Sequence, residues 1–204
     1  MKFLAVPAVL ALAITGSEPR PLTLDEALAE VTGEVTQPVQ EVEEEVEVAP
    51  TEKVWVCEGC SENEKETLEF LQKRGIRDRA ALSTVMGNIR QESMFLTDIC
   101  EGGARVPYHQ CHSGGFGLIQ FTSAARYHGL GTFSSRYGLD PSSLEAQLRW
   151  MVNEPQWVRY EPYLKGEGQS IEYYMKHAYA WLGWGIHGAR TQYSYNYYNR
   201  LTQA

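Results

Sequence analysis

Basic side chains are scarce in this chain, which has 18 lysines and arginines against 26 aspartates and glutamates among its 204 residues. The formal net charge of −8 excludes the broad positive surface that binds nucleic acid. Long apolar runs are also absent after the first residues, so we expect no transmembrane helix, which needs about 20 such residues. Hydrophobic residues nevertheless make up 43% of the chain and aromatics 11%, which excludes wholesale disorder.

Residues 18–53 have no aromatic side chain and hold 11 acidic against 2 basic residues. Such a segment has little to bury and its like charges repel, so we predict an acidic disordered linker. Residues 54–204 hold 15 residues of each sign and all the tryptophans and tyrosines. At roughly 150 residues per domain, this part predicts one folded domain.

The first 17 residues are typical of an export signal. A single lysine, Lys2, precedes an apolar run from Phe3 to Thr15, and small residues follow it. The run is too short to span a bilayer comfortably. We therefore predict a secretory signal peptide, with a retained hydrophobic N-terminus as the alternative.

Cysteine is rare but even in number, with four residues at positions 57, 60, 100 and 111. An exported chain permits disulfides, and four cysteines allow three pairings. We favour structural disulfides, with Cys100–Cys111 first because that bridge closes a short loop. A zinc-stabilised interaction module built on Cys57, Cys60, Cys111 and His112 is the rival from another class of protein.

The folded part is predicted to be mainly helical with a small irregular insert. A capping box at 61–64 starts one helix, and Asp78 starts a second whose apolar residues recur at helical spacing up to Ile89. Further helices are expected from 140, from 170 to 181 and from about 189 to 200. Between them, the glycine-rich stretch 98–121 predicts loops and a short β-hairpin. The fold class is therefore α+β and mainly α-helical.

Glu92 is the strongest candidate for chemistry. It comes three residues after Ile89 and so continues the apolar stripe of its helix. Burial there raises the pKa of a carboxyl toward that of a usable general acid. The alternative is a helix-end glutamate that turns to solvent or pairs with Arg90 or Arg105.

Three ordered blocks carry a family resemblance. Residues 87–93, GNIRQES, end in Glu92-Ser93; residues 115–121, GFGLIQF, contain Gly117-Leu118-Ile119-Gln120; and 144–148, LEAQL, follow. Together they resemble the lysozyme-like superfamily, most closely the bacteriophage tail lysozymes, with soluble lytic transglycosylases and goose-type lysozymes as relatives. The resemblance covers about residues 61–200 and implies a lysozyme-like fold whose insert folds over a cleft.

The resemblance implies roles for the matching residues. Glu92 becomes the general acid that protonates the glycosidic oxygen between N-acetylmuramic acid and N-acetylglucosamine. Ser93 orients that carboxyl or a sugar and Gln120 lines the cleft; a helix C-cap and a capped turn are their structural alternatives. Aromatic residues that suit the apolar faces of sugar rings are Tyr108, Phe121, Trp181 and Trp184, with packing in the core or at its rim as the alternative. Tyr179 matches a family tyrosine.

A second carboxylate is the open part of this site. Glycosidases commonly use two, and Asp98 and Glu101 both lie in the insert, where either is a candidate. The alternative is a surface charge, which is favoured for Asp98. A single acid suffices when the N-acetyl group of the substrate assists, which gives an anhydro product. Residues 178–181, AYAW, lack the asparagine that transglycosylases usually carry there, which counts against that outcome.

The resulting prediction is a peptidoglycan-degrading glycosidase of phage origin, exported or carried in a virion. It needs no cofactor and no metal, because protonation and water attack require only positioned carboxyls. Its partner is the glycan strand, and other virion proteins are further candidates. A lytic transglycosylase with the same site and a non-catalytic virion or wall-binding protein are the alternatives.

Overall fold

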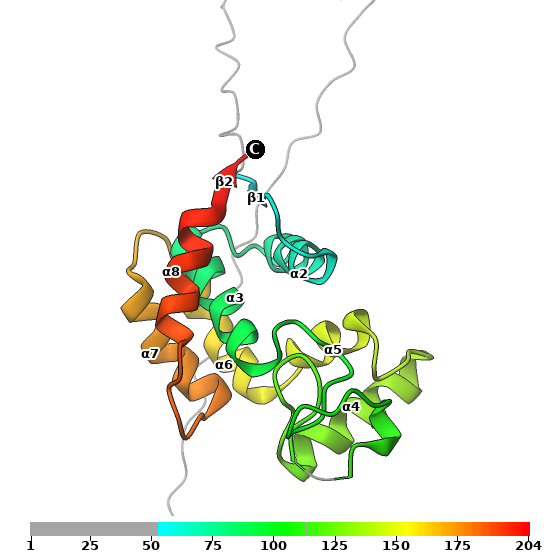
Figure 1. Cartoon of the computed structure of the whole chain (residues 1–204). Coiled ribbons are helices and arrows are strands. Elements are labelled where there is room, and N and C mark those ends of the chain that lie inside the picture. Colours follow the sequence, from blue (N-terminus) through cyan, green and yellow to red (C-terminus); the bar gives the residue numbers. More distant parts are fainter. Residues whose placement is uncertain (1–52, 113) are drawn as a thin grey trace, which may run out of the picture. The chain divides into compact units, whose positions relative to one another are not determined.

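The computed structural model describes residues 53–112 and 114–204, which form a mainly helical α+β fold, as predicted (Figure 1). The predicted export signal, and all but the last residue of the predicted linker, lie outside the described residues. In chain order the elements are β1 (Trp55–Cys57), α2 (Glu62–Lys73), α3 (Arg79–Ser93), the 3-10 turn η1 (Tyr108–Gln110), α4 (Ala124–Tyr137), α5 (Leu144–Met151), α6 (Pro155–Leu164), α7 (Ile171–Leu182), α8 (Arg190–Arg200) and β2 (Leu201–Gln203). Among the described residues, no helix has the length and apolarity that a membrane crossing requires.

Helix α3 is the centre of the domain. Asp78 caps its start by accepting the backbone N–H of Ala81 at 2.9 Å. Its apolar residues are buried as predicted, because α7 and α8 pack along it (Figure 1). Gly87 permits the close approach of α8, since a Cβ at this position would lie 2.3 Å from Ser194 Oγ.

Helices α4 and α6 are not predicted by the sequence analysis. Over its 14 residues α4 buries only Leu130 and Ser134, so it lacks the apolar stripe that predicts a helix. Helix α6 contains Pro162, a residue that ordinarily interrupts a helix. The helix expected from 140 begins later, because Ser143 supplies the cap that the backbone N–H of Ala146 requires.

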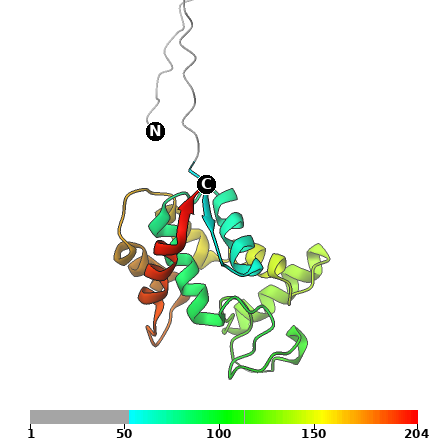
Figure 2. The same cartoon turned by 45° about the horizontal axis from the view of Figure 1, so that its top comes forward.

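A two-stranded antiparallel sheet joins the two ends of the described domain, with Trp55 opposite Gln203 (Figure 2). The other edge of β1 is covered by Gln72, whose side chain accepts from the N–H of Trp55 at 2.7 Å and donates to its carbonyl at 2.9 Å. The disulfide Cys57–Cys60 closes the turn that follows β1. The local sequence pattern does not predict this sheet, because its strands lie at opposite ends of the domain sequence.

The insert is held by two isolated β-bridges, Ile99 with Arg105 and Cys100 with Phe116, and by a disulfide. The predicted bridge Cys100–Cys111 is present, with α-carbons 5.6 Å apart. Because all four sulfurs are paired in disulfides, the zinc module proposed on Cys57, Cys60, Cys111 and His112 is wrong.

Candidate active site

Glu92 lies in the last turn of α3, one residue before the helix ends. Its side chain is 15% exposed, so the carboxyl is largely withdrawn from water while a route to solvent remains. The buried Ile89 lies one turn earlier on the same stripe. This is the placement that the apolar spacing predicts, and the alternative pairings with Arg90 or Arg105 are not formed.

The partner of Glu92 is Arg190, the first residue of α8. Arg190 Nη2 lies 2.6 Å from Glu92 Oε1, and the arginine side chain is only 6% exposed. Its guanidinium also lies 4.7 Å from the centroid of the Trp184 ring. Arg190 is not among the residues predicted from the sequence, although a cation in the first turn of a helix opposes the helix dipole and so indicates another partner.

Two opposing influences act on the Glu92 carboxyl. Burial raises its pKa, and the charge of Arg190, the hydrogen bond from Arg190 and the charge of Arg126 lower it, with burial prevailing. Burial also lowers the pKa of Arg190, against the attraction of Glu92. Glu92 therefore holds its proton more firmly than an exposed glutamate does, beside a cation that stabilises the carboxylate once the proton has left.

The loop between α7 and α8 is fastened to α3, and this positions Arg190. Gln91 Oε1 accepts the backbone N–H of Ala189 at 2.7 Å. Gly188 adopts a positive φ of 62°, and a Cβ there would lie 2.7 Å from the Gln91 side chain. A residue with a side chain would therefore displace the loop that carries Arg190.

Ser93 fastens the end of α3 to the insert. It is buried, and its hydroxyl donates to the Leu118 carbonyl at 2.7 Å, while the C-cap of α3, the structural alternative for Ser93, is Met94. Gln147 braces the same segment from α5 by accepting the Leu118 N–H at 2.7 Å and donating to the Thr97 carbonyl at 2.6 Å. Two buried polar side chains, Ser93 and Gln147, thus hold the GLIQ block in position. This role of Gln147 is not predicted from the sequence.

Gln120 closes a turn of the insert. It has a positive φ of 50°, and its side-chain amide donates to the Gly117 carbonyl at 3.0 Å. Its side chain is half-buried, so a face remains available for a ligand. The stacking role predicted for Phe121 is wrong, because its ring is fully buried beneath the guanidinium of Arg126, 5.7 Å away. Trp181 is likewise part of the core and unavailable to a sugar.

Tyr108 and Tyr127 join the insert to α4. Their rings stack with centroids 4.3 Å apart, and the Tyr108 hydroxyl donates to the Tyr127 carbonyl at 2.8 Å. Burial raises the pKa of Tyr108 to about 12. Both rings line a hollow of about 540 Å³, whose rim includes three histidines, His109, His112 and His128. Tyr108 therefore remains accessible from one side.

The two candidate second carboxylates are engaged within the insert. Asp98 Oδ1 lies 2.5 Å from Arg105 Nη2, and Glu101 Oε2 accepts the backbone N–H of Gly115 at 2.9 Å. A further carboxylate, Glu154, is buried against Arg126, whose Nη2 lies 2.7 Å from Glu154 Oε2. Each of these groups is neutralised or hydrogen-bonded by a protein partner.

Tyr179 and Trp184 pack against each other, and the Trp184 ring also contacts Arg190. Their rings meet edge to face with centroids 5.2 Å apart, and Tyr179 is 56% exposed. Both line a hollow of about 410 Å³, which His187 and Lys176 also line. Stacking of the Trp184 ring on a sugar, and the match of Tyr179 to a family tyrosine, stay predictions.

Comparison with known proteins identifies one family. The family model described as phage tail lysozyme matches residues 62–198, a range that includes α2 to α7 and nearly all of α8. No curated protein matches the chain. The match covers Glu92 and Arg190 together with the insert between α3 and α4.

Proposed function

The chain belongs to the phage tail lysozyme family, and we propose that it cleaves the glycan strand of peptidoglycan with Glu92 as the general acid. A lysozyme-like function on peptidoglycan follows from the family itself. The observation that supports the catalytic proposal is the largely buried Glu92 carboxyl at the end of α3, ion-paired with Arg190.

The reaction begins with proton transfer from Glu92 to the glycosidic oxygen. The bond between that oxygen and the anomeric carbon of N-acetylmuramic acid breaks, and the N-acetylglucosamine oxygen leaves as a hydroxyl. Glu92 is then a carboxylate 2.6 Å from the Arg190 guanidinium, which stabilises the new charge. Water adds to the anomeric carbon and returns its proton to Glu92, so the enzyme ends the cycle as it began.

A lytic transglycosylase is the second candidate, favoured by one observation. Asp98 and Glu101, the two candidates for activating water, are engaged by Arg105 and by the Gly115 backbone. Without a free second carboxylate, the N-acetyl group of the substrate attacks the anomeric carbon in place of water. The 6-hydroxyl of the same sugar then displaces it and gives its proton to the Glu92 carboxylate, which leaves an anhydro ring and consumes no water.

Each segment of the chain has its own role in this function. Residues 1–17 direct export, residues 18–53 form an acidic spacer, and residues 54–204 form the catalytic domain. Two disulfides suit a protein that works outside the reducing cytoplasm, exported or carried in a virion. An inward, ion-paired Glu92 favours the enzyme over a non-catalytic wall-binding member of the same family.

Clearing of purified cell walls by the full chain tests the proposal. Glu92→Gln keeps the size of the side chain but cannot donate the proton, so clearing is expected to fall by about 10²–10⁴-fold. Glu145→Gln, an exposed position on α5, is the matched control and keeps the activity of the parent. Activity of Glu92→Gln within a factor of about two of the control would overturn the role of Glu92. Mass analysis of the fragments separates reducing ends from anhydro ends.

A further inference from the structure

A third hollow lies between α3 and α8, away from Glu92. It measures about 350 Å³ and is lined by Arg90, Tyr193, Asn196, Tyr197, Asn199 and Arg200. Arg90 and Glu92 are two residues apart in α3, so their side chains point in directions about 200° apart around the helix. The proposed glycan chemistry therefore leaves this hollow unused, although its volume falls in the range of small-ligand sites, about 300–1,000 Å³.

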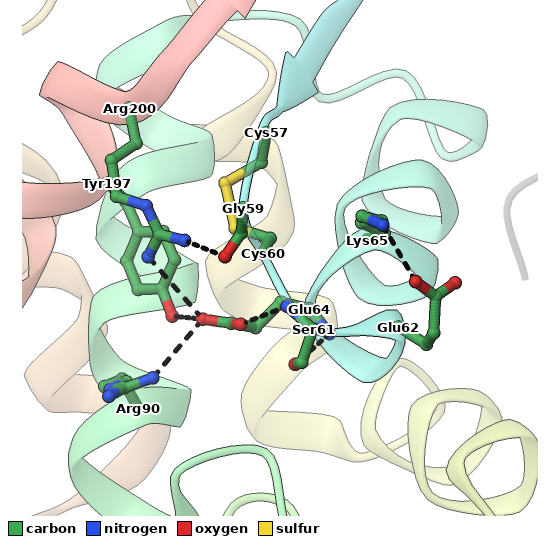
Figure 3. Close-up of a disulfide and its surroundings, with 10 residues drawn as sticks. All are labelled: Cys57, Gly59, Cys60, Ser61, Glu62, Glu64, Lys65, Arg90, Tyr197 and Arg200. Carbon is green, nitrogen blue, oxygen red and sulfur yellow. Dashed lines mark hydrogen bonds and ion pairs between the residues drawn. A yellow bond between two sulfur atoms is a disulfide. The ribbon is translucent and has the colours of Figure 1, made fainter.

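The inner wall of the hollow holds two arginines that share one carboxylate. Figure 3 shows Arg90, Tyr197 and Arg200 converging on Glu64, whose side chain is 5% exposed. Arg90 Nη1 lies 3.4 Å from Glu64 Oε1 and Arg200 Nη1 lies 3.8 Å from the same oxygen, which also accepts from the Tyr197 hydroxyl. Two cations and one anion leave one positive charge, and both arginine side chains are more than a third exposed.

The disulfide turn holds one of these arginines in place. Arg200 Nη2 donates to the Gly59 carbonyl at 2.9 Å, and Gly59 lies within the turn that Cys57–Cys60 closes (Figure 3). Arg90 is placed by α3 and lies 5.9 Å from the centroid of the Tyr193 ring. Because both guanidiniums are positioned before a ligand arrives, less conformational entropy is lost on binding.

The rim adds neutral hydrogen-bonding groups. Asn196 and Asn199 are exposed and lie one turn apart on α8, so their amides face the same side of the helix. Guanidinium groups match carboxylates with paired hydrogen bonds, amides suit peptide groups, and the Tyr193 ring suits small apolar side chains. The combination fits a short peptide with a free carboxylate better than it fits a neutral sugar.

We propose that this hollow binds a carboxylate of the short peptides attached to peptidoglycan strands. The site holds the domain on the wall through a group that is not cleaved, on the opposite face of α3 from Glu92. The proposal rests on the proposed function, because a protein that acts on peptidoglycan meets such peptides at every strand.

Binding of synthetic peptides to the full chain tests this site. The probes are a stem peptide with free carboxylates, the same peptide with its carboxylates amidated, and inorganic phosphate, each titrated by calorimetry. Asn196→Asp and Asn199→Asp, singly and together, place negative charge on the rim at exposed positions. Gln169→Glu, exposed in the loop before α7, makes the same change in net charge as either single aspartate variant, but outside the hollow.

We expect the acidic peptide to bind the parent and Gln169→Glu alike, and the double aspartate variant about tenfold or more weakly. Amidation of the peptide should weaken binding by a similar factor. Equal binding of the amidated peptide, displacement by phosphate at equal concentration, or unchanged binding by the aspartate variants would each overturn the proposal.

The Glu92→Gln variant separates this inference from the proposed function. It should bind the acidic peptide as the parent does, because Glu92 lies outside the hollow. Wall clearing by the parent without peptide binding would overturn the inference alone. Peptide binding without wall clearing would overturn the proposed function and leave a wall-binding protein.

Discussion

Arg190 Nη2 lies 2.6 Å from Glu92 Oε1, and the two residues belong to the end of α3 and the start of α8. The pair brings the last helix of the domain to the proposed catalytic carboxyl. Because Arg190 is buried, its charge acts on Glu92 with little screening by water. Removal of either partner leaves the other charge without compensation, so the pair is the first target for mutation.

Arg190→Gln should shift the pH dependence of wall cleavage. Arg190 lowers the pKa of Glu92 against the raising effect of burial, so its loss raises that pKa further. The acid then keeps its proton to higher pH, so the alkaline limb of the kcat/KM profile shifts to higher pH. The maximal rate should fall by about 10²-fold, because the carboxylate formed in the reaction loses its counter-charge.

The matched control is Arg159→Gln, which removes an exposed arginine of α6. Its pH profile should coincide with that of the parent. An alkaline limb of Arg190→Gln that stays in place or moves to lower pH would show that Arg190 does not control the ionisation of Glu92.

Glu64→Gln should lower the free energy of unfolding at neutral pH and leave it less affected in acid. Burial raises the pKa of Glu64, but the hydrogen bonds from Tyr197 and Ser61 and the charge of Arg200 together bring that pKa below the ordinary value of a glutamate. Such a carboxylate contributes stability above about pH 4.5, which is lost as the pH falls through the folded pKa. The expected loss at pH 7 is about 2–3 kcal/mol, from hydrogen bonds to a charged group.

Urea unfolding at several pH values measures this effect. Glu62→Gln, two residues away and exposed, is the control and should unfold as the parent does. A difference between Glu64→Gln and the parent that does not shrink in acid would mean that the ionised carboxyl is not the stabilising group.

Gly87→Ala should destabilise the contact between α3 and α8. The added Cβ would lie 2.3 Å from Ser194 Oγ and 2.5 Å from the Ser194 backbone nitrogen, so the helices must separate. Overpacking of this kind costs about 1–3 kcal/mol, which thermal unfolding detects. Gly166→Ala is the control, because its nearest neighbour would be 3.5 Å away. Equal melting temperatures for the two variants would contradict the close approach.

Deletion of residues 1–53 should leave the melting temperature and the intrinsic activity nearly unchanged, because residues 18–53, which precede the domain, have no aromatic residue and little to bury. Deletion of residues 1–60 removes β1 and its disulfide as well, and it should lower the melting temperature clearly. Differential scanning calorimetry of both truncations gives the comparison. A large loss already in the shorter deletion would show that the tail packs on the domain.

The helices that the sequence predicts are those whose apolar stripes and caps lie close together in the chain. The capping box of α2 and the Asp78 cap of α3 are confirmed, with the side chains of Ser61 and Asp78 accepting backbone N–H groups. Helix α4 was missed because it buries little, and its packing against α5 compensates only in the folded state. The β1–β2 sheet was missed because its two strands pair across the whole domain.

The sequence by itself determined the mainly helical class, the Cys100–Cys111 bridge as first choice, and Glu92 as the leading candidate, because each rests on residue types at short spacing. Only the tertiary structure placed Arg190 against Glu92, buried Phe121 out of reach of a ligand, and gathered Arg90, Glu64 and Arg200 around one hollow. These relationships join residues far apart in the chain. They depend on how α3 and α8 pack, and helix packing is decided by the shapes of both surfaces together.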